Sequence, residues 1–187
     1  MSGSKITRYF FGSFPEQSER EAILARANAI QEGLGLGGNR VLKTKINLTL
    51  AFIGAFEGEH DRIVREAIAA GDAILPSGPH DLHFDRLLRF DGDGYGKNRD
   101  FQPAMFYPSV VPESLRKTVD RLREKLSLPA GDDITLLPPH VTWIYTDSNR
   151  VDQAVPIEPL SLQAESICLI RSMQGAGEYE IVQKWPL

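Results

Sequence analysis

The sequence predicts an α+β fold of two lobes, each consisting of a sheet with helices on its outer side. Two observations lead to this prediction. Apolar, β-prone runs alternate with three stretches that have the apolar spacing of an amphipathic helix. The segments Asn47–Leu50 and His140–Trp143 also look like copies of one pattern, about half the chain apart. We therefore expect one domain, residues 1–187, with a pseudo-twofold relation between its lobes and a central cleft that both motif strands face.

A strand followed by a helix is expected at the N-terminus. Ile6–Phe14 is an apolar, aromatic run typical of a strand. Pro15 suits the first turn of a helix, and Glu16 and Glu19 then lie where the helix dipole favours negative charge. The glycine-rich segment 33–38 ends this helix and lacks the Lys-Ser/Thr ending of a P-loop. We interpret that segment as a flexible connection.

The first motif lies between a short strand and a second helix. Arg40–Lys43 is expected to form the short strand, and Ile46–Ile53 the strand that carries the motif, with Gly54 at its end. Glu57–Ala73 is expected to be helical, because its apolar residues recur on one face.

The second half repeats this mixture of strands and helix. Pro112 opens a helix whose apolar residues recur at steps of three and four. A polar, glycine-rich loop is expected at Asp91–Arg99. The expected strands are Leu82–Phe90, Ala104–Tyr107, Val141–Tyr145, Leu160–Arg171 and Glu178–Trp185.

The composition excludes several classes of protein. A hydrophobic share of 42% and a charged share of 25% are ordinary for a globular domain. No apolar run approaches the roughly 20 residues of a membrane span, and no apolar leader follows Met1. The net charge of −4 argues against a protein that coats nucleic acid, but it permits a local basic pocket for one phosphate. We expect a cytoplasmic monomer with no membrane partner.

The sequence predicts neither a metal site nor a cofactor. It has four histidines and one cysteine, without the paired spacings of metal ligands. His80 and His83 are three apart in an expected strand, so they should face opposite sides. Cys168 cannot form an internal disulfide, and its apolar surroundings indicate a buried position.

The two motifs have the residues that phosphate-ester chemistry needs. Side chains two apart in a strand share a face, so Asn47 accompanies Thr49 and His140 accompanies Thr142. Two imidazoles can move protons on opposite sides of phosphorus while two hydroxyls hold its non-bridging oxygens. Here an amide stands where the first imidazole would be, and an amide does not exchange a proton at neutral pH.

Over nearly its whole length the chain resembles the 2H phosphoesterases, most closely the LigT-like RNA 2′,3′-cyclic phosphodiesterases, also called 2′-5′ RNA ligases. The segments that carry the resemblance are Arg8–Phe11, Ile46–Gly54, Pro139–Trp143, Ser172–Gly177, Tyr179–Val182 and Trp185–Leu187. The resemblance implies a bilobal fold in which two antiparallel sheets line a cleft, with helices outside. It also implies metal-independent chemistry on phosphodiesters at RNA ends or in related nucleotides.

The same resemblance implies roles for individual residues. His140 would transfer a proton, and Thr49 and Thr142 would bind phosphate oxygens. Asn47 occupies the position of the family's other proton-transfer histidine. Tyr145 occupies the position at which many relatives have a phosphate-binding arginine, so a positive charge is missing there.

Further residues near the motifs are candidates for substrate contacts. Six of them could contact phosphate, although surface lysines and arginines are usually solvated: Lys43, Lys45, Lys97, Arg99, Arg171 and Ser172. Tyr9 and Trp143 could stack on a base, or they could belong to the core. Tyr145 could donate a hydrogen bond.

Three functions remain open from the sequence. The first is hydrolysis of 2′,3′-cyclic phosphate ends of RNA or nucleotides, weakened by Asn47. The second is binding of a nucleotide or RNA end with little or no catalysis. The third is a structural or interaction role with a vestigial cleft. The expected partners of the first two are RNA 3′ ends or cyclic nucleotides.

Overall fold

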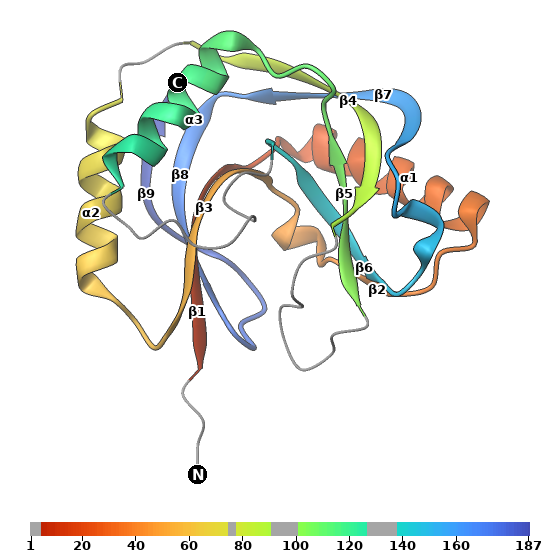
Figure 1. Cartoon of the computed structure of the whole chain (residues 1–187), viewed down its shortest axis with the longest axis horizontal. Coiled ribbons are helices and arrows are strands. Elements are labelled where there is room, and N and C mark those ends of the chain that lie inside the picture. Colours follow the sequence, from red (N-terminus) through yellow and green to blue (C-terminus); the bar gives the residue numbers. More distant parts are fainter. Residues whose placement is uncertain (1–4, 75–77, 91–100, 127–137) are drawn as a thin grey trace.

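The computed structural model describes residues 5–74, 78–90, 101–126 and 138–187. Within these ranges the chain forms two antiparallel sheets and three α-helices (Figure 1), which confirms the predicted α+β class. The expected loop at Asp91–Arg99, with Lys97 and Arg99, lies outside the described residues.

The first sheet has four strands in the order β3-β1-β8-β9. Its strands are β1 (Ile6–Ser13), β3 (Leu48–Glu57), β8 (Ser166–Met173) and β9 (Glu180–Pro186). The second sheet has five strands in the order β2-β6-β5-β4-β7. Its strands are β2 (Asn39–Arg40), β4 (His80–Arg89), β5 (Gln102–Tyr107), β6 (Val141–Thr146) and β7 (Val155–Ala164). The two motif strands, β3 and β6, therefore belong to different sheets.

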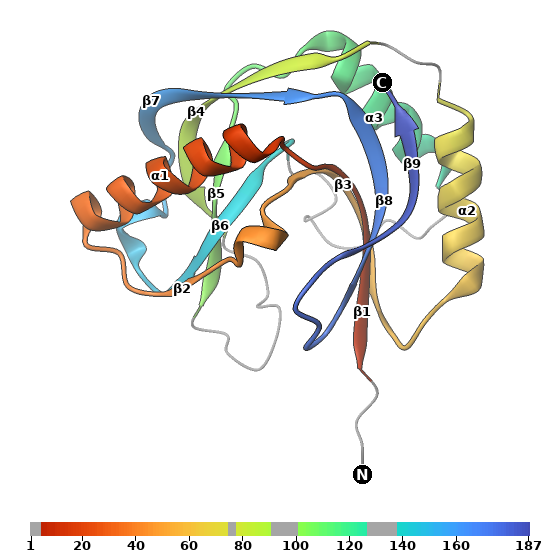
Figure 2. The same ribbon diagram turned by 180° about the vertical axis from the view of Figure 1, so that it is seen from behind.

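The helices lie on the outer sides of the two sheets. Helices α2 (Asp61–Asp72) and α3 (Glu113–Lys125) lie beside the first sheet (Figure 1), whereas α1 (Gln17–Leu34) crosses the second (Figure 2). Helix α1 begins where expected, because the Glu19 carboxylate accepts a hydrogen bond from the Glu16 backbone N–H at 2.9 Å. It ends at Gly35, whose φ of 59° is in the left-handed region that favours glycine.

Some expected bounds were wrong: β3 continues past Gly54 to Glu57, so α2 begins at Asp61 and not at Glu57. The longest expected strand was also wrong. Leu160–Arg171 is not a single strand: β7 ends at Ala164 in the second sheet, and β8 begins at Ser166 in the first. Only Glu165 separates the two strands, and its carbonyl accepts a hydrogen bond from the Leu187 N–H at 3.0 Å. The β-prone pattern continues through both strands, so the sequence offers no turn signal at the point where the chain changes sheets.

A second difference precedes the first motif. The short strand expected at Arg40–Lys43 is instead the two-residue β2, and Lys43–Lys45 forms a 3₁₀ turn. Strand β3 then begins at Leu48, so Asn47 is the residue immediately before the strand. The turn redirects the chain from the second sheet into the first.

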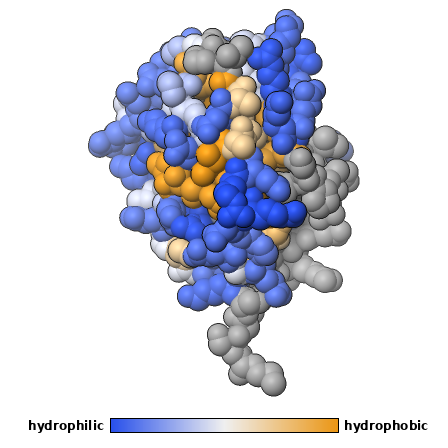
Figure 3. Space-filling view, turned by 90° about the vertical axis from the view of Figure 1, so that its left-hand side faces the viewer, coloured by the Kyte–Doolittle hydropathy of each residue, from blue (hydrophilic) through white to orange (hydrophobic). Residues whose placement is uncertain are grey.

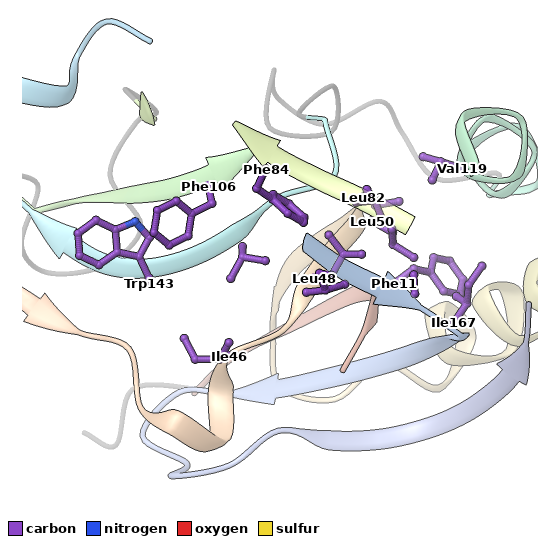
Figure 4. Packing of buried hydrophobic residues seen from close by; sticks show 14 of the residues in the cluster. Phe11, Ile46, Leu48, Leu50, Leu82, Phe84, Phe106, Val119, Trp143 and Ile167 are labelled. Atoms are coloured by element: carbon purple, nitrogen blue, oxygen red, sulfur yellow. The ribbon is translucent and has the colours of Figure 1, made fainter. Parts of the chain in front are cut away.

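The core joins the two sheets. Leu48 and Leu50 of β3, Phe11 of β1, and Phe84 and Phe106 of the second sheet belong to one buried cluster (Figure 4). On the side of the molecule where α2 lies, hydrophobic surface forms a band flanked by hydrophilic residues (Figure 3). Burial of large apolar side chains from both sheets fixes how the two motif strands meet.

Two smaller expectations, one about Cys168 and one about the two histidines of β4, are confirmed. Cys168 is buried, in contact with Phe10 and Ile170, and burial raises the pKa of its thiol. His80 is buried and His83 is exposed, so they face opposite sides of β4. Among the described helices, none is long and apolar enough to span a membrane.

Candidate functional site

The two motifs meet in an antiparallel bridge between the sheets. The Thr49 backbone N–H donates to the His140 carbonyl at 2.8 Å, and the His140 N–H donates to the Thr49 carbonyl at 3.1 Å. Asn47 and His140 hold matching positions, because each immediately precedes its strand, β3 or β6. The main chain thus holds the first residue of one motif beside the third residue of the other.

This bridge lies in the wall of a cleft of about 520 Å³. Asn47, Thr49, His140 and Thr142 all line the cleft, so the four motif side chains predicted to act together share one cavity. The remaining walls come mainly from β1, β3 and the turn between β8 and β9. The residue types are suited to hold a phosphate group next to one imidazole.

The environment of His140 fixes its protonation state. Its Nδ1 lies 2.9 Å from the Pro138 carbonyl oxygen, and a carbonyl oxygen only accepts, so Nδ1 carries the hydrogen. Burial lowers the pKa of His140, and the hydrogen bond to Pro138 opposes this change only partly. The ring is therefore neutral at pH 7, and Nε2 has the lone pair that can accept a proton.

Asn47 donates to the neighbouring motif hydroxyl. Its Nδ2 lies 3.2 Å from Thr49 Oγ1, which leaves the Thr49 hydroxyl hydrogen available for another acceptor. Gly12 of β1 makes room for this pair. A Cβ on Gly12 would lie 3.1 Å from Asn47 Nδ2 and 2.7 Å from the Leu48 carbonyl oxygen. The close approach of β1 to the first motif therefore requires glycine at this position.

The cleft is locally positive although the chain is acidic overall. Arg8, Arg40 and Lys45 line it, and no aspartate or glutamate does so within the described ranges. Lys45 Nζ donates to the Ala176 carbonyl at 2.6 Å and lies 5.3 Å from the centre of the Tyr179 ring. Burial and the nearby Arg8 charge both lower the pKa of Lys45. A negatively charged ligand fits this environment.

Of the candidate substrate contacts, Tyr145 and Ser172 line the cleft. Tyr145 reaches it because β6 contains a bulge: Ile144 pairs with Ala104 and Thr142 with Met105, which leaves Trp143 as the extra residue. Without the bulge, Thr142 and Tyr145 would face opposite sides of the sheet. With it, both face the cleft.

The structure corrects two other candidates, Tyr9 and Trp143. Tyr9 is completely buried and Trp143 is 2% exposed, so neither ring can stack on a base. Tyr9 alternates with Arg8 and Phe10, which line the cleft, and it therefore faces the core. Trp143 stacks on Phe106, with ring centres 5.4 Å apart (Figure 4). Both residues therefore belong to the core, which was the other possibility that the sequence left open for them.

Lys43 and Arg171 are engaged elsewhere. Lys43 forms an ion pair with Glu21 of α1 at 3.2 Å and does not line the cleft. Arg171 pairs with Glu59 and Glu180, at 2.8 and 2.5 Å. Neither side chain is placed to contact a ligand that occupies the cleft.

Two arginines and one tyrosine of the cleft were not expected from the sequence. Arg8, Arg40 and Tyr179 line the cavity, and none of them was a candidate for contacting a ligand. The sequence offered no usable signal for Arg8, because the candidate in that strand was its neighbour Tyr9, which faces the opposite side. Arg40 and Tyr179 reach the cleft through pairing between segments that are distant in sequence. Among the described residues, no group of three or more His, Cys, Asp or Glu side chains could hold a metal ion.

Comparison of the structure with solved structures identifies the fold. LigT of E. coli in its apo form matches with a TM-score of 0.69 and 21% identity, covering 98% of this chain and 99% of LigT. This is the LigT fold. TT0787 of Thermus thermophilus matches with a TM-score of 0.67 and 19% identity, over 96% of this chain and 97% of its own. Usb1 of Kluyveromyces marxianus matches with a TM-score of 0.56 and 12% identity, over 98% and 99%.

The sequence by itself gives no such match. No protein-family model and no curated protein matches the chain. The likeness to LigT is therefore established at the level of the fold, with two antiparallel sheets and helices outside them, as the resemblance implied.

Proposed function

We propose that this protein is a phosphodiesterase of the 2H type that hydrolyses 2′,3′-cyclic phosphate ends of RNA or of nucleotides. The observation that carries the proposal is the meeting of both motifs in one positively charged cleft, joined by the Thr49–His140 bridge. The LigT fold supports it. E. coli LigT has been solved with 3′-AMP and with ATP, which are nucleotide ligands.

In the proposed reaction, water attacks phosphorus and one of the two ring P–O bonds breaks. His140 Nε2 takes the proton of the attacking water, a role that suits a neutral imidazole whose Nδ1–H is held by Pro138. Thr49 and Thr142 donate hydrogen bonds to the non-bridging oxygens. Asn47 donates a hydrogen bond to the departing ribose oxygen, which receives its proton from solvent. The product is a phosphate monoester beside a free ribose hydroxyl.

This assignment makes the enzyme slow rather than inactive. A positioned general acid typically contributes about 10²–10⁴-fold, and Asn47 cannot supply it. The same observation favours a second function, in which the cleft binds a nucleotide or RNA end with little or no turnover. The two alternatives differ in whether the remaining motif residues still form a working catalytic site.

A hydrolysis assay separates the alternatives. The substrates are adenosine and cytidine 2′,3′-cyclic phosphates and a short RNA with a cyclic phosphate end, with EDTA present throughout. The variants are the unchanged chain, Asn47→His and His140→Ala. We expect Asn47→His to raise turnover by about 10²-fold or more, and His140→Ala to abolish it. Nucleotide binding without turnover in any variant would instead establish the binding function.

A further inference from the structure

A second group of polar and charged side chains lines the same cleft and does not belong to the two motifs. Arg8 of β1, Lys45, Tyr145 of β6 and Tyr179 all line the cavity, and they come from four separate segments of the chain. We propose that these four residues form a second anion-binding subsite, which takes a second phosphate of the ligand. The inference rests on the proposed function and names its substrate class: cyclic phosphate ends that are joined to a further phosphate.

The four groups are close enough to influence one another. The Arg8 charge lowers the pKa of Lys45 and opposes the burial-driven rise in the pKa of Tyr145 and Tyr179. Lys45 lies over the Tyr179 ring, and Tyr179 packs edge-on against Phe10 with ring centres 5.4 Å apart. These contacts hold the Lys45 and Tyr179 side chains against each other.

The chemistry of the cluster suits a phosphate. The arginine and the lysine that line the same cleft both attract an anion. Burial raises the pKa of Tyr179 to about 12, so its phenol stays protonated and can donate a hydrogen bond. Tyr145 also has a raised pKa and is 40% exposed, which leaves it accessible to a ligand. Arginine and lysine with two phenol donors match the oxygens of a phosphate group.

The position of Arg8 along β1 indicates a phosphate other than the one that reacts. Gly12 of β1 lies against Asn47 of the first motif, and Arg8 is four residues away on the same strand. At about 3.3 Å per residue, this places the Arg8 backbone roughly 13 Å from the Gly12 backbone. A ligand with two phosphates can occupy both places. The surrounding rim, with Leu42 and Met173 exposed, offers apolar surface for the part of the ligand between them.

The test compares two ligands that differ by one phosphate. Isothermal titration measures binding of cytidine 3′-monophosphate and cytidine 3′,5′-bisphosphate to the unchanged protein, Arg8→Gln, Lys45→Gln and Lys43→Gln. Lys43→Gln is the matched control, because it removes a lysine that pairs with Glu21 outside the cleft. We expect a preference for the bisphosphate that falls about tenfold in Arg8→Gln and in Lys45→Gln, and that Lys43→Gln retains.

The outcomes separate this inference from the proposed function. Equal affinity of the unchanged protein for both ligands, or equal losses for both ligands in Arg8→Gln and Lys45→Gln, overturns the second subsite even if hydrolysis is observed. Another outcome is that the protein prefers the bisphosphate through Arg8 and Lys45 and yet hydrolyses no substrate. That result would support the second subsite and overturn the proposed hydrolytic function. Tyr179→Phe removes only a hydroxyl and should reduce the preference less than either cation substitution.

Discussion

The two motif segments have matching backbone positions and different chemistry. Asn47 and His140 each precede a strand, and each is followed two residues later by a threonine in the same cleft. The imidazole of His140 is fixed by a backbone carbonyl, whereas the amide of Asn47 is used to orient the Thr49 hydroxyl. In the proposed function the first motif holds a phosphate, and only the second also transfers a proton.

Replacing His140 by asparagine would give both motifs an amide at their first position. This change should have the largest effect on hydrolysis. In His140→Asn neither motif can transfer a proton, and we expect hydrolysis of a cyclic phosphate to fall by about 10²–10⁴-fold. Asn47→Ala is the matched control, because it removes only a hydrogen-bond donor and should cost much less. Equal losses in the two variants, measured as kcat/KM, would show that His140 is not the catalytic base.

Replacing Asn47 by histidine would give both motifs an imidazole. This change should alter the pH dependence of kcat/KM. The pKa of His140 is lowered below its ordinary value of about 6.5, and a base must be deprotonated to act. For the unchanged protein kcat/KM should therefore be level near neutral pH and decline in acid, with a midpoint below that value. Asn47→His adds an acid that must stay protonated, so its profile should be bell-shaped. A profile for the unchanged protein that rises toward acid pH would assign His140 to the acid role.

Substitution of either motif threonine should lower kcat/KM by a similar factor, whereas substitutions of Asn47 and His140 should differ strongly in their effect. Thr49→Val and Thr142→Val each remove one hydrogen bond to a charged phosphate oxygen, which corresponds to roughly a 10- to 100-fold loss in kcat/KM. Thr49→Val should cost somewhat more, because it also leaves Asn47 Nδ2 without its acceptor. Steady-state kinetics of both variants measure the difference, and a loss below threefold in either would remove that hydroxyl from the site.

The smallest effect on hydrolysis should come from a substitution of Gly12, which lies beside the first motif and affects mainly the stability of the fold. Gly12→Ala places a methyl group against the Leu48 carbonyl oxygen, so we expect about 1–3 kcal/mol of destabilisation and a displaced Asn47. Gly33→Ala is the control, because a Cβ there meets nothing within 4 Å, and alanine favours the helix interior. Thermal unfolding measures both variants. No loss of stability in Gly12→Ala would mean that β1 and the first motif are not as tightly packed as described.

Much of the site could be predicted from local pattern alone. Asn47, Thr49, His140 and Thr142 were identified by their spacing of two in β-prone runs, and all four line the cleft. The α+β class and the start of α1 also follow from local signals, because strand alternation and helix capping depend on residues a few positions apart.

Other features were decided only when distant segments packed together. The bulge at Trp143 turns Tyr145 into the cleft, and a single extra residue of this kind reverses which side chains face which side of a sheet. The change of sheet at Glu165 leaves no trace in composition, because both adjoining strands have the same β-prone character.

The sequence by itself identified the residues whose chemistry suits a phosphate site and placed them in or beside two strands. The tertiary structure decided that Tyr145 faces the cleft, that Tyr9 belongs to the core, and that Arg8 lines the same cleft as Lys45. The physical reason is that alternation within a strand is a local property. The pairing of strands and the direction of each sheet face depend on contacts between residues far apart in the chain.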